Sequence, residues 1–249
     1  MISKAKTKWV KSLQLKKYRQ EEQCFMVQGM KGVQELLKSD YTIEMVVSTE
    51  DVLRQVGRAI QKKVGEWIVA SPRELEAMGS FESNGYILAI ARMKNIPLPE
   101  PEAGKYLLVL DDIRDPGNLG TIIRTADWFG IGQIVASQQT ADVYNPKTIS
   151  ATMGSFCRVQ VTYTDIFTFL SGCKVPVYGA FLSGRNVHNE KFGKGGIVVI
   201  GNESNGISPD VEKLVSHRIS VPGRGKAESL NAAMATGIIL DNIFRSIQD

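Results

Sequence analysis

The chain has 249 residues, of which 43% are hydrophobic, 22% charged and 8% aromatic, which excludes a disordered, collagen-like or disulfide-scaffold protein. The formal net charge is only +4. Residues 1–22 carry seven basic side chains against two acidic ones, and the other 227 residues sum to −1, so the positive charge is concentrated at one end of the chain.

Residues 1–22 are predicted to form a basic amphipathic helix, because Trp9 and Leu13, with Val10 beside them, place an apolar stripe among the lysines. Clustered lysines attract polyanions, which favours a contact with RNA phosphates or a partner. A solvated helix that packs through its stripe accounts for the segment equally well. Both interpretations stay open.

The next seventy residues alternate between strand-type and helix-type patterns, which is typical of a compact α/β module. The predicted strands are Cys24–Gln28, Ile43–Ser48, Trp67–Ala70 and Tyr86–Ala91, and the predicted helices are Lys31–Ser39, Asp51–Lys63 and Pro72–Met78. Residues 95–104 follow with prolines at 97, 99 and 101, where neither a helix nor a central strand continues. We therefore predict two domains, residues 1–95 and 105–249, joined by a Pro-rich linker at 96–104.

The second half predicts a parallel sheet with both faces covered, because its apolar strands are joined through helices. The predicted strands are Tyr106–Leu110, Ile134–Ala136, Val175–Phe181 and Ile197–Ile200. The predicted helices are Asn118–Phe129, one that begins at Ser208-Pro209, and Leu230–Ile247.

Several classes of protein are disfavoured by what the sequence lacks. Three cysteines, Cys24, Cys157 and Cys173, and two histidines show no metal-type spacing, so we expect no metal. No stretch approaches the ~18 apolar residues of a membrane span, and no apolar leader opens the chain, so we expect a cytoplasmic protein without a membrane partner. Neither a Walker A loop nor a GxGxxG turn occurs, which disfavours a nucleotide-triphosphatase or an NAD enzyme.

Three polar clusters follow predicted strands, where ligands of parallel α/β sheets collect. The first runs from Asp115 to Arg124, and a helix opened by Asn118 with an arginine reaching back suits an anion. The second is the loop Ile200–Pro209 with Glu203, and in the third Ser229 or Asn231 caps the last helix. Ordinary capping explains any one of them. The occurrence of all three polar clusters together favours a ligand-binding site.

The residues of these clusters, and the order in which the clusters occur, resemble the motifs of a known family. Asp115-Pro-Gly-Asn118-Leu-Gly120 with Arg124, then Gly201-Asn-Glu203 with Gly206, then Ser229-Leu-Asn231 resemble the three motifs of the SpoU (TrmH-like) RNA 2′-O-ribose methyltransferases of the SPOUT superfamily. The segment Ser150–Phe156 resembles the stretch between the first two motifs. Residues 26–36 resemble the start of the small ribosomal-protein-like domain that binds the RNA substrate in many members.

The resemblance implies roles for individual residues. It implies that Arg124 helps to activate the ribose 2′-hydroxyl and that Asn118 positions it. It implies that Glu203, Ser229 and Asn231 surround the substrate and the methyl donor. The donor is S-adenosylmethionine, which the family holds largely by backbone groups, and the matching positions are Gly201, Val221 and Leu230.

The resemblance also implies a C-terminal trefoil knot and a homodimer. The resulting hypothesis is an S-adenosylmethionine-dependent methyltransferase that acts on a ribose 2′-hydroxyl of structured RNA, ribosomal RNA in preference to transfer RNA. The alternative is a non-catalytic RNA-binding or ribosome-assembly protein that retains the fold.

Overall fold

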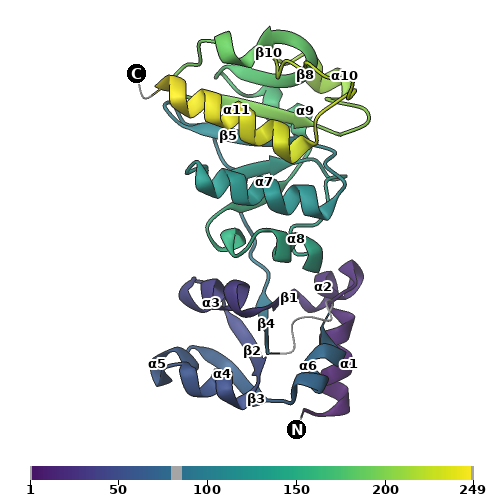
Figure 1. Cartoon of the computed structure of the whole chain (residues 1–249), viewed down its shortest axis with the longest axis vertical. Coiled ribbons are helices and arrows are strands. Elements are labelled where there is room, and N and C mark those ends of the chain that lie inside the picture. The colour runs from purple at the N-terminus through teal and green to yellow at the C-terminus, as the bar shows by residue number, and fades with distance from the viewer. Residues whose placement is uncertain (1, 80–85, 248–249) are drawn as a thin grey trace. The chain divides into compact units, whose positions relative to one another are not determined.

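A computed structural model describes residues 2–79 and 86–247. The chain divides into two compact units (Figure 1). Unit 1 holds the residues up to Asn95 together with Asp142–Cys157, and unit 2 holds Ile96–Ala141 and the residues from Arg158 onward. The segment Asp142–Cys157 therefore packs with the N-terminal part although unit 2 surrounds it in sequence. The bounds 1–95, 96–104 and 105–249 stay a prediction.

Among the described residues, unit 1 contains a four-stranded mixed sheet in the order β1-β4-β2-β3. Of the strand pairs that these described residues form, only β2–β3 is parallel. The strands are β1 (Cys24–Gln28), β2 (Ile43–Ser48), β3 (Val64–Val69) and β4 (Ile87–Arg92). The helices are α1 (Lys4–Ser12), α2 (Lys16–Glu22), α3 (Met30–Lys38), α4 (Glu50–Gln55), α5 (Arg58–Gln61), α6 (Pro72–Met78) and α8 (Pro146–Ala151), followed by the 3-10 turn η1 (Ser155–Cys157).

The prediction of one helix over residues 1–22 is wrong, since α1 and α2 are separated by a turn after Ser12. The apolar stripe itself is confirmed, because Val10 and Leu13 are fully buried and Trp9 packs partly against the same core. The helix predicted over Asp51–Lys63 is likewise two helices, because the chain is extended at Gly57, the N-cap of α5.

Arg19, which the sequence groups with the basic residues of the N-terminus, is only 1% exposed. Its Nη1 donates to the carbonyl oxygens of Leu13 at 2.9 Å and Gln14 at 2.8 Å, and its Nη2 lies 2.6 Å from Oδ2 of Asp142. The guanidinium thus satisfies carbonyls that the break between α1 and α2 leaves free. It also fixes the segment Asp142–Cys157 to unit 1.

The described residues of unit 2 form a six-stranded sheet in the order β10-β8-β9-β5-β6-β7, with every pair parallel. The strands are β5 (Tyr106–Asp111), β6 (Gln133–Ala136), β7 (Gln160–Tyr163), β8 (Val177–Asn186), β9 (Gly196–Gly201) and β10 (His217–Ser220). The helices are α7 (Pro116–Trp128), α9 (Ile166–Ser171), α10 (Pro209–Glu212) and α11 (Ala232–Ile247), with the 3-10 turn η2 (Val187–Asn189).

Both faces of this sheet are covered, as predicted. Leu107 and Val109 belong to an apolar cluster with residues of α9 and α10. Tyr106, which points to the opposite face because strand side chains alternate, contacts Phe244 of α11. Helix α11 packs beside α7 (Figure 1). The α/β class and the parallel sheet are confirmed, and the knot stays a prediction.

No helix within residues 2–79 and 86–247 is both long and apolar enough to cross a membrane.

We predict that Arg19→Met lowers the free energy of unfolding by about 3–5 kcal/mol, because it leaves the largely buried Asp142 carboxylate without its cation. Urea unfolding followed by circular dichroism measures the change. Arg54→Met is the control, since Arg54 pairs with Glu50 on an exposed helix face and should cost less than about 1 kcal/mol. Equal losses in the two variants would contradict the structural role of Arg19.

Candidate active site

The candidate site lies at the carboxyl edge of the parallel sheet in unit 2. Strand β5 pairs with β9, and Asp111 at the end of β5 stands opposite Gly201 at the end of β9. The loops that follow the two strands are therefore neighbours, although about ninety residues separate them in sequence. Such an edge is where parallel α/β sheets bind ligands.

Helix α7 begins at Pro116 and is capped by Asp115, whose Oδ1 accepts from the backbone N of Asn118 at 2.9 Å. The prediction that Asn118 opens the helix is wrong. Aspartate is one of the residues preferred at an N-cap, and the residue after Asp115 is a proline, which is preferred at the first helical position. The side chain of Asn118, in the first turn, is left free for tertiary contacts.

The Asn118 side chain joins two other segments. Its Nδ2 donates to Oε1 of Glu203, in the loop after β9, and its Oδ1 accepts from Nδ2 of Asn231 at 2.9 Å. Asn231 also caps α11, since its Oδ1 accepts from the backbone N of Ala233 at 3.0 Å. Of the two caps that the sequence left open, Ser229 and Asn231, it is thus Asn231 that serves. We call Asn118, Glu203 and Asn231 the amide–carboxylate network.

The loop that carries Glu203 is closely packed at Gly201. A Cβ built there would lie 2.3 Å from the carbonyl carbon of Gly206 and 2.4 Å from the backbone N of Ile207. The backbones of Asn202 and Gly206 also bond to each other in both directions, at 3.0 and 2.9 Å. Only glycine fits at position 201 without moving this turn.

Asn202 and Asp111, for which the sequence predicted no role, hold the loop in place. Asn202 donates through Nδ2 to the carbonyl of Asp112 at 2.7 Å, and Asp111 accepts from the backbone N of Ser208 at 2.7 Å. The only sequence signals for these two roles are an aspartate at a strand end and an asparagine beside a glycine, and both signals are weak. A cavity of about 460 Å³ at this edge is lined in part by Asp111 and Asn202.

The other predicted site residues lie outside the network. Arg124 is exposed on α7, and Ser229 is exposed ahead of α11. Neither side chain has a hydrogen bond or an ion pair within the described ranges. Val221 follows β10 and is half-buried, while Leu230 is 47% exposed.

The loop between Val221 and Asn231 offers backbone groups to a ligand. Within the part of the chain that the structure describes, no backbone–backbone hydrogen bond involves residues 222–230. Nor do the described residues contain three or more His, Cys, Asp or Glu side chains arranged to hold a metal ion.

The fold of unit 2 and the polar loops at the carboxyl edge of its sheet define the class of this protein. It is an α/β protein whose candidate ligand-binding loops meet at the carboxyl end of an all-parallel sheet. Residues 105–241 match the SpoU rRNA Methylase family, and residues 4–89 match the MRM3-like substrate binding domain. The first match covers more than half of the chain. The chain therefore belongs to the SpoU rRNA Methylase family.

Three similar proteins match this chain over nearly its whole length. The 23S rRNA (guanosine(2553)-2′-O)-methyltransferase RlmP of Bacillus subtilis is 28% identical over 94% of each chain. A TrmH-family structure from Porphyromonas gingivalis is 35% identical over 98% of each chain, with a TM-score of 0.85. An AdoMet-bound rRNA methyltransferase from Sinorhizobium meliloti is 28% identical over 98% of this chain and 96% of its own, with a TM-score of 0.88.

We predict that Gly201→Ala lowers the free energy of unfolding by about 1–3 kcal/mol, because the added methyl group displaces the Gly206–Ile207 backbone. Gly225→Ala is the control, since a Cβ at that position meets no atom within 4 Å. Thermal unfolding of both variants measures the effect. A Gly225→Ala loss as large as that of Gly201→Ala would show that packing at the turn is not the cause.

Proposed function

We propose that the chain is an S-adenosylmethionine-dependent methyltransferase that methylates a ribose 2′-hydroxyl in structured RNA, ribosomal RNA in preference to transfer RNA. The amide–carboxylate network at the carboxyl edge of unit 2, in a chain of the SpoU rRNA Methylase family, is the observation that carries this proposal. The preference for ribosomal RNA rests on RlmP, whose name states a 23S rRNA substrate and whose similarity spans both parts of the chain.

The residues present fit the proposed cofactor. S-adenosylmethionine supplies an activated methyl group when bound, and its leaving thioether is neutral, so no acid needs to assist departure. A ligand held through backbone groups needs a loop whose N–H and C=O groups are not used within the protein, and residues 222–230 meet that need. Gly201, Val221 and Leu230 are the positions proposed to hold it.

Catalysis then depends on placing the 2′-oxygen and easing the loss of its proton. A guanidinium stays protonated in proteins, so we assign Arg124 to anchoring a neighbouring phosphate and stabilising negative charge that develops on the oxygen. Asn118 is assigned to positioning the hydroxyl, and Glu203, Ser229 and Asn231 to surrounding the substrate. Arg124 is exposed and has no hydrogen bond or ion pair among the described residues, so its guanidinium is available to a phosphate. This supports the role assigned to Arg124.

The proposal includes a homodimer in the cytoplasm. Unit 2 exposes large apolar side chains on the adjacent helices α7 and α11, Trp128 at 85% and Met234 at 61%, which a second copy of the chain would cover. No disulfide joins any of the described cysteines, which suits a reducing compartment.

Replacement of Arg124 tests the catalytic assignment. We expect Arg124→Ala to slow methylation of ribosomal RNA roughly 100-fold or more, and Arg124→Lys to stay far below the unmodified protein, because a lysine lacks the bidentate fork. Mass spectrometry of 2′-O-methyl nucleosides measures the product. Near-normal turnover of Arg124→Lys would contradict a role for the guanidinium.

Calorimetric titration with S-adenosylmethionine is the control, and both Arg124 variants should bind it normally. If the unmodified protein fails to bind S-adenosylmethionine, the methyltransferase proposal is wrong. The non-catalytic RNA-binding alternative then replaces it.

The exposed lysines of α1 test the RNA contact of the N-terminus. Deleting residues 1–22 would also remove Val10 and Leu13 from the core, so substitutions are the cleaner experiment. We expect Lys8→Ala/Lys11→Ala to weaken ribosomal RNA binding and to flatten its log–log salt dependence by up to about 2 units. Lys191→Ala/Lys194→Ala in unit 2 is the matched control. A salt slope unchanged in the α1 variant would favour the solvated-helix interpretation.

A further inference from the structure

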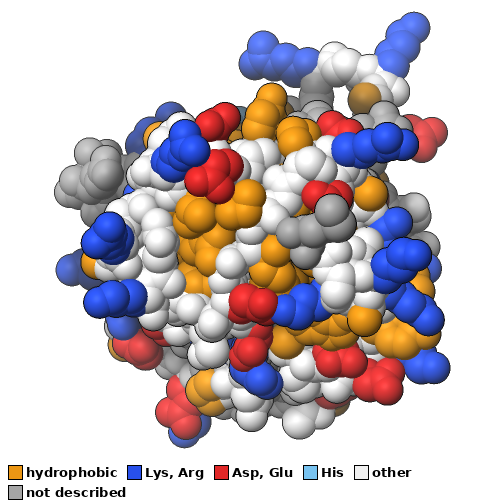
Figure 2. Space-filling view, turned by 90° about the horizontal axis from the view of Figure 1, so that it is seen from below, with side chains coloured by type: hydrophobic (Ala, Val, Ile, Leu, Met, Phe, Trp, Pro, Cys, Tyr) orange, Lys and Arg blue, Asp and Glu red, His pale blue; other side chains and the backbone are white. Residues whose placement is uncertain are grey.

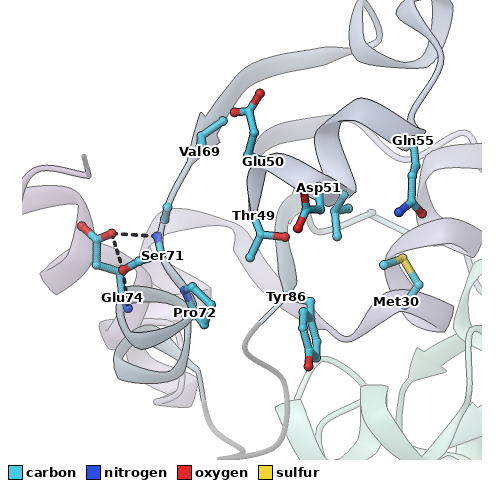
Figure 3. A pocket seen from close by; sticks show the side chains of 12 residues that line it. Met30, Thr49, Glu50, Asp51, Gln55, Val69, Ser71, Pro72, Glu74 and Tyr86 are labelled. Atoms are coloured by element: carbon cyan, nitrogen blue, oxygen red, sulfur yellow. Dashed lines mark hydrogen bonds between the residues drawn. The ribbon is translucent and has the colours of Figure 1, made fainter.

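Unit 1 contains a cavity of about 790 Å³ that the proposed function does not use. It lies at the carboxyl ends of the parallel strands β2 and β3, where α4 and α6 begin (Figure 3). The start of α3 and Tyr86, just ahead of β4, complete the lining. We call this cavity the unit 1 pocket.

The apolar part of the pocket presents an exposed aromatic ring. Tyr86 is 63% exposed and Met30 is 38% exposed, which is unusual for side chains of this size beside a cavity. Figure 3 shows the Tyr86 ring between Pro72 on one side and Met30 on the other. A flat ligand entering here can stack on the tyrosine.

The polar part of the pocket presents side chains that have no hydrogen-bond partner among the described residues. These are Thr49, Asp51 and Gln55, all of which line the pocket. By contrast, Glu74 is occupied by the capping box of α6, with Ser71, and Glu50 pairs with Arg54. The pocket therefore offers a carboxylate that accepts hydrogen bonds, together with an amide and a hydroxyl that both donate and accept.

The helices that open onto the pocket also carry basic residues, which do not line it. They are Lys31 of α3, Arg54 of α4 and Arg73 of α6, and all three residues are exposed. Figure 2, the view from below, shows apolar side chains in the middle of a face, with acidic side chains beside them and many Lys and Arg side chains toward the edge. The lining itself carries the carboxylates Glu50, Asp51 and Glu74, so the pocket suits the flat, neutral base of a nucleotide and leaves the anionic phosphates outside it.

We propose that the unit 1 pocket binds one unstacked nucleobase of single-stranded RNA, which stacks on Tyr86 and presents its hydrogen-bonding edge to Asp51 and Gln55. The proposal rests on the proposed function, in which this chain acts on RNA. Proteins read RNA sequence in this way, by stacking a splayed base on an aromatic ring and bonding its edge.

The chemistry of Asp51 further predicts which bases fit. An ionised carboxylate only accepts hydrogen bonds, so it favours a base with an exocyclic amino group, such as adenine or cytosine. Uracil has no amino group and offers only its N3–H as a donor on this edge, and the two carbonyl groups that flank this N–H would face the carboxylate unfavourably. The pocket should therefore prefer adenine and cytosine to uracil.

Fluorescence anisotropy with labelled nine-nucleotide RNAs, all-adenine, all-cytosine and all-uracil, tests this proposal on the full chain. We expect the first two to bind more tightly than the third. Tyr86→Ala should weaken their binding roughly 5- to 100-fold, the range for the loss of one stacked base. Tyr86→Phe should retain it, and Asp51→Asn should reduce the discrimination against uracil because an amide can donate to its carbonyls.

Leu182→Ala is the control, since Leu182 is a large apolar residue of unit 2 that is 78% exposed and lines neither the unit 1 pocket nor the cavity at the carboxyl edge of unit 2. The pocket assignment is overturned if Tyr86→Ala binds all three RNAs as tightly as the unmodified chain, which would leave the pocket to another class of ligand. It is also overturned if Tyr86→Phe loses as much affinity as Tyr86→Ala although both variants unfold at the temperature of the unmodified chain.

Failure of this proposal is distinguishable from failure of the proposed function. S-adenosylmethionine binding and ribosomal RNA methylation by the unmodified chain test only the latter. If both activities are present and the Tyr86 variants bind RNA normally, the pocket assignment alone is wrong.

Discussion

The arrangement of the candidate site depends on the side-chain amide of Asn118. An amide carries a donor and an acceptor on one rigid group, so it can donate to the Glu203 carboxylate and accept from Asn231 at the same time. No aspartate or leucine of similar size can do both. Three segments that span about 110 residues of sequence therefore meet at one point, which fixes the start of α7, the loop after β9 and the start of α11 relative to one another.

That use of Asn118 is possible because Asp115 provides the helix cap, and this explains what sequence reasoning missed. The polar cluster itself was predictable, since the apolar runs Tyr106–Leu110 and Ile197–Ile200 end at polar loops. Which of two neighbouring residues caps the helix depends on a competition between local and tertiary hydrogen bonds, and the sequence shows only the local candidates. The strands Gln160–Tyr163 and His217–Ser220 were missed for a similar reason, because they are short and rich in polar residues and gain their stability from parallel neighbours rather than from their own pattern.

The segment Asp142–Cys157 shows the same limit on a larger scale. Its resemblance to a stretch between two motifs gave no reason to separate it from unit 2. Its packing in unit 1 depends on the buried ion pair with Arg19 and on aromatic contacts of Phe25 with Tyr144 and Phe156. Burial raises the pKa of the Tyr144 hydroxyl, which therefore stays neutral, and its oxygen accepts a hydrogen bond from the backbone N of Lys94 at 3.0 Å. Partners that lie more than a hundred residues away leave no periodic signal in the sequence.

Charge alone therefore says little about how such a chain would select its RNA. Arg19 contributes to the positive count of the N-terminus but is buried, whereas Lys8 and Lys11 are exposed. Contacts from such lysines to phosphates position an RNA without reading its sequence. Selectivity needs groups that meet the bases, and in unit 1 the aromatic ring and the unpaired polar side chains of the pocket have that chemistry. Under the proposed function, the lysines would determine how strongly the RNA binds, the unit 1 pocket which RNA binds, and the amide–carboxylate network what is done to it.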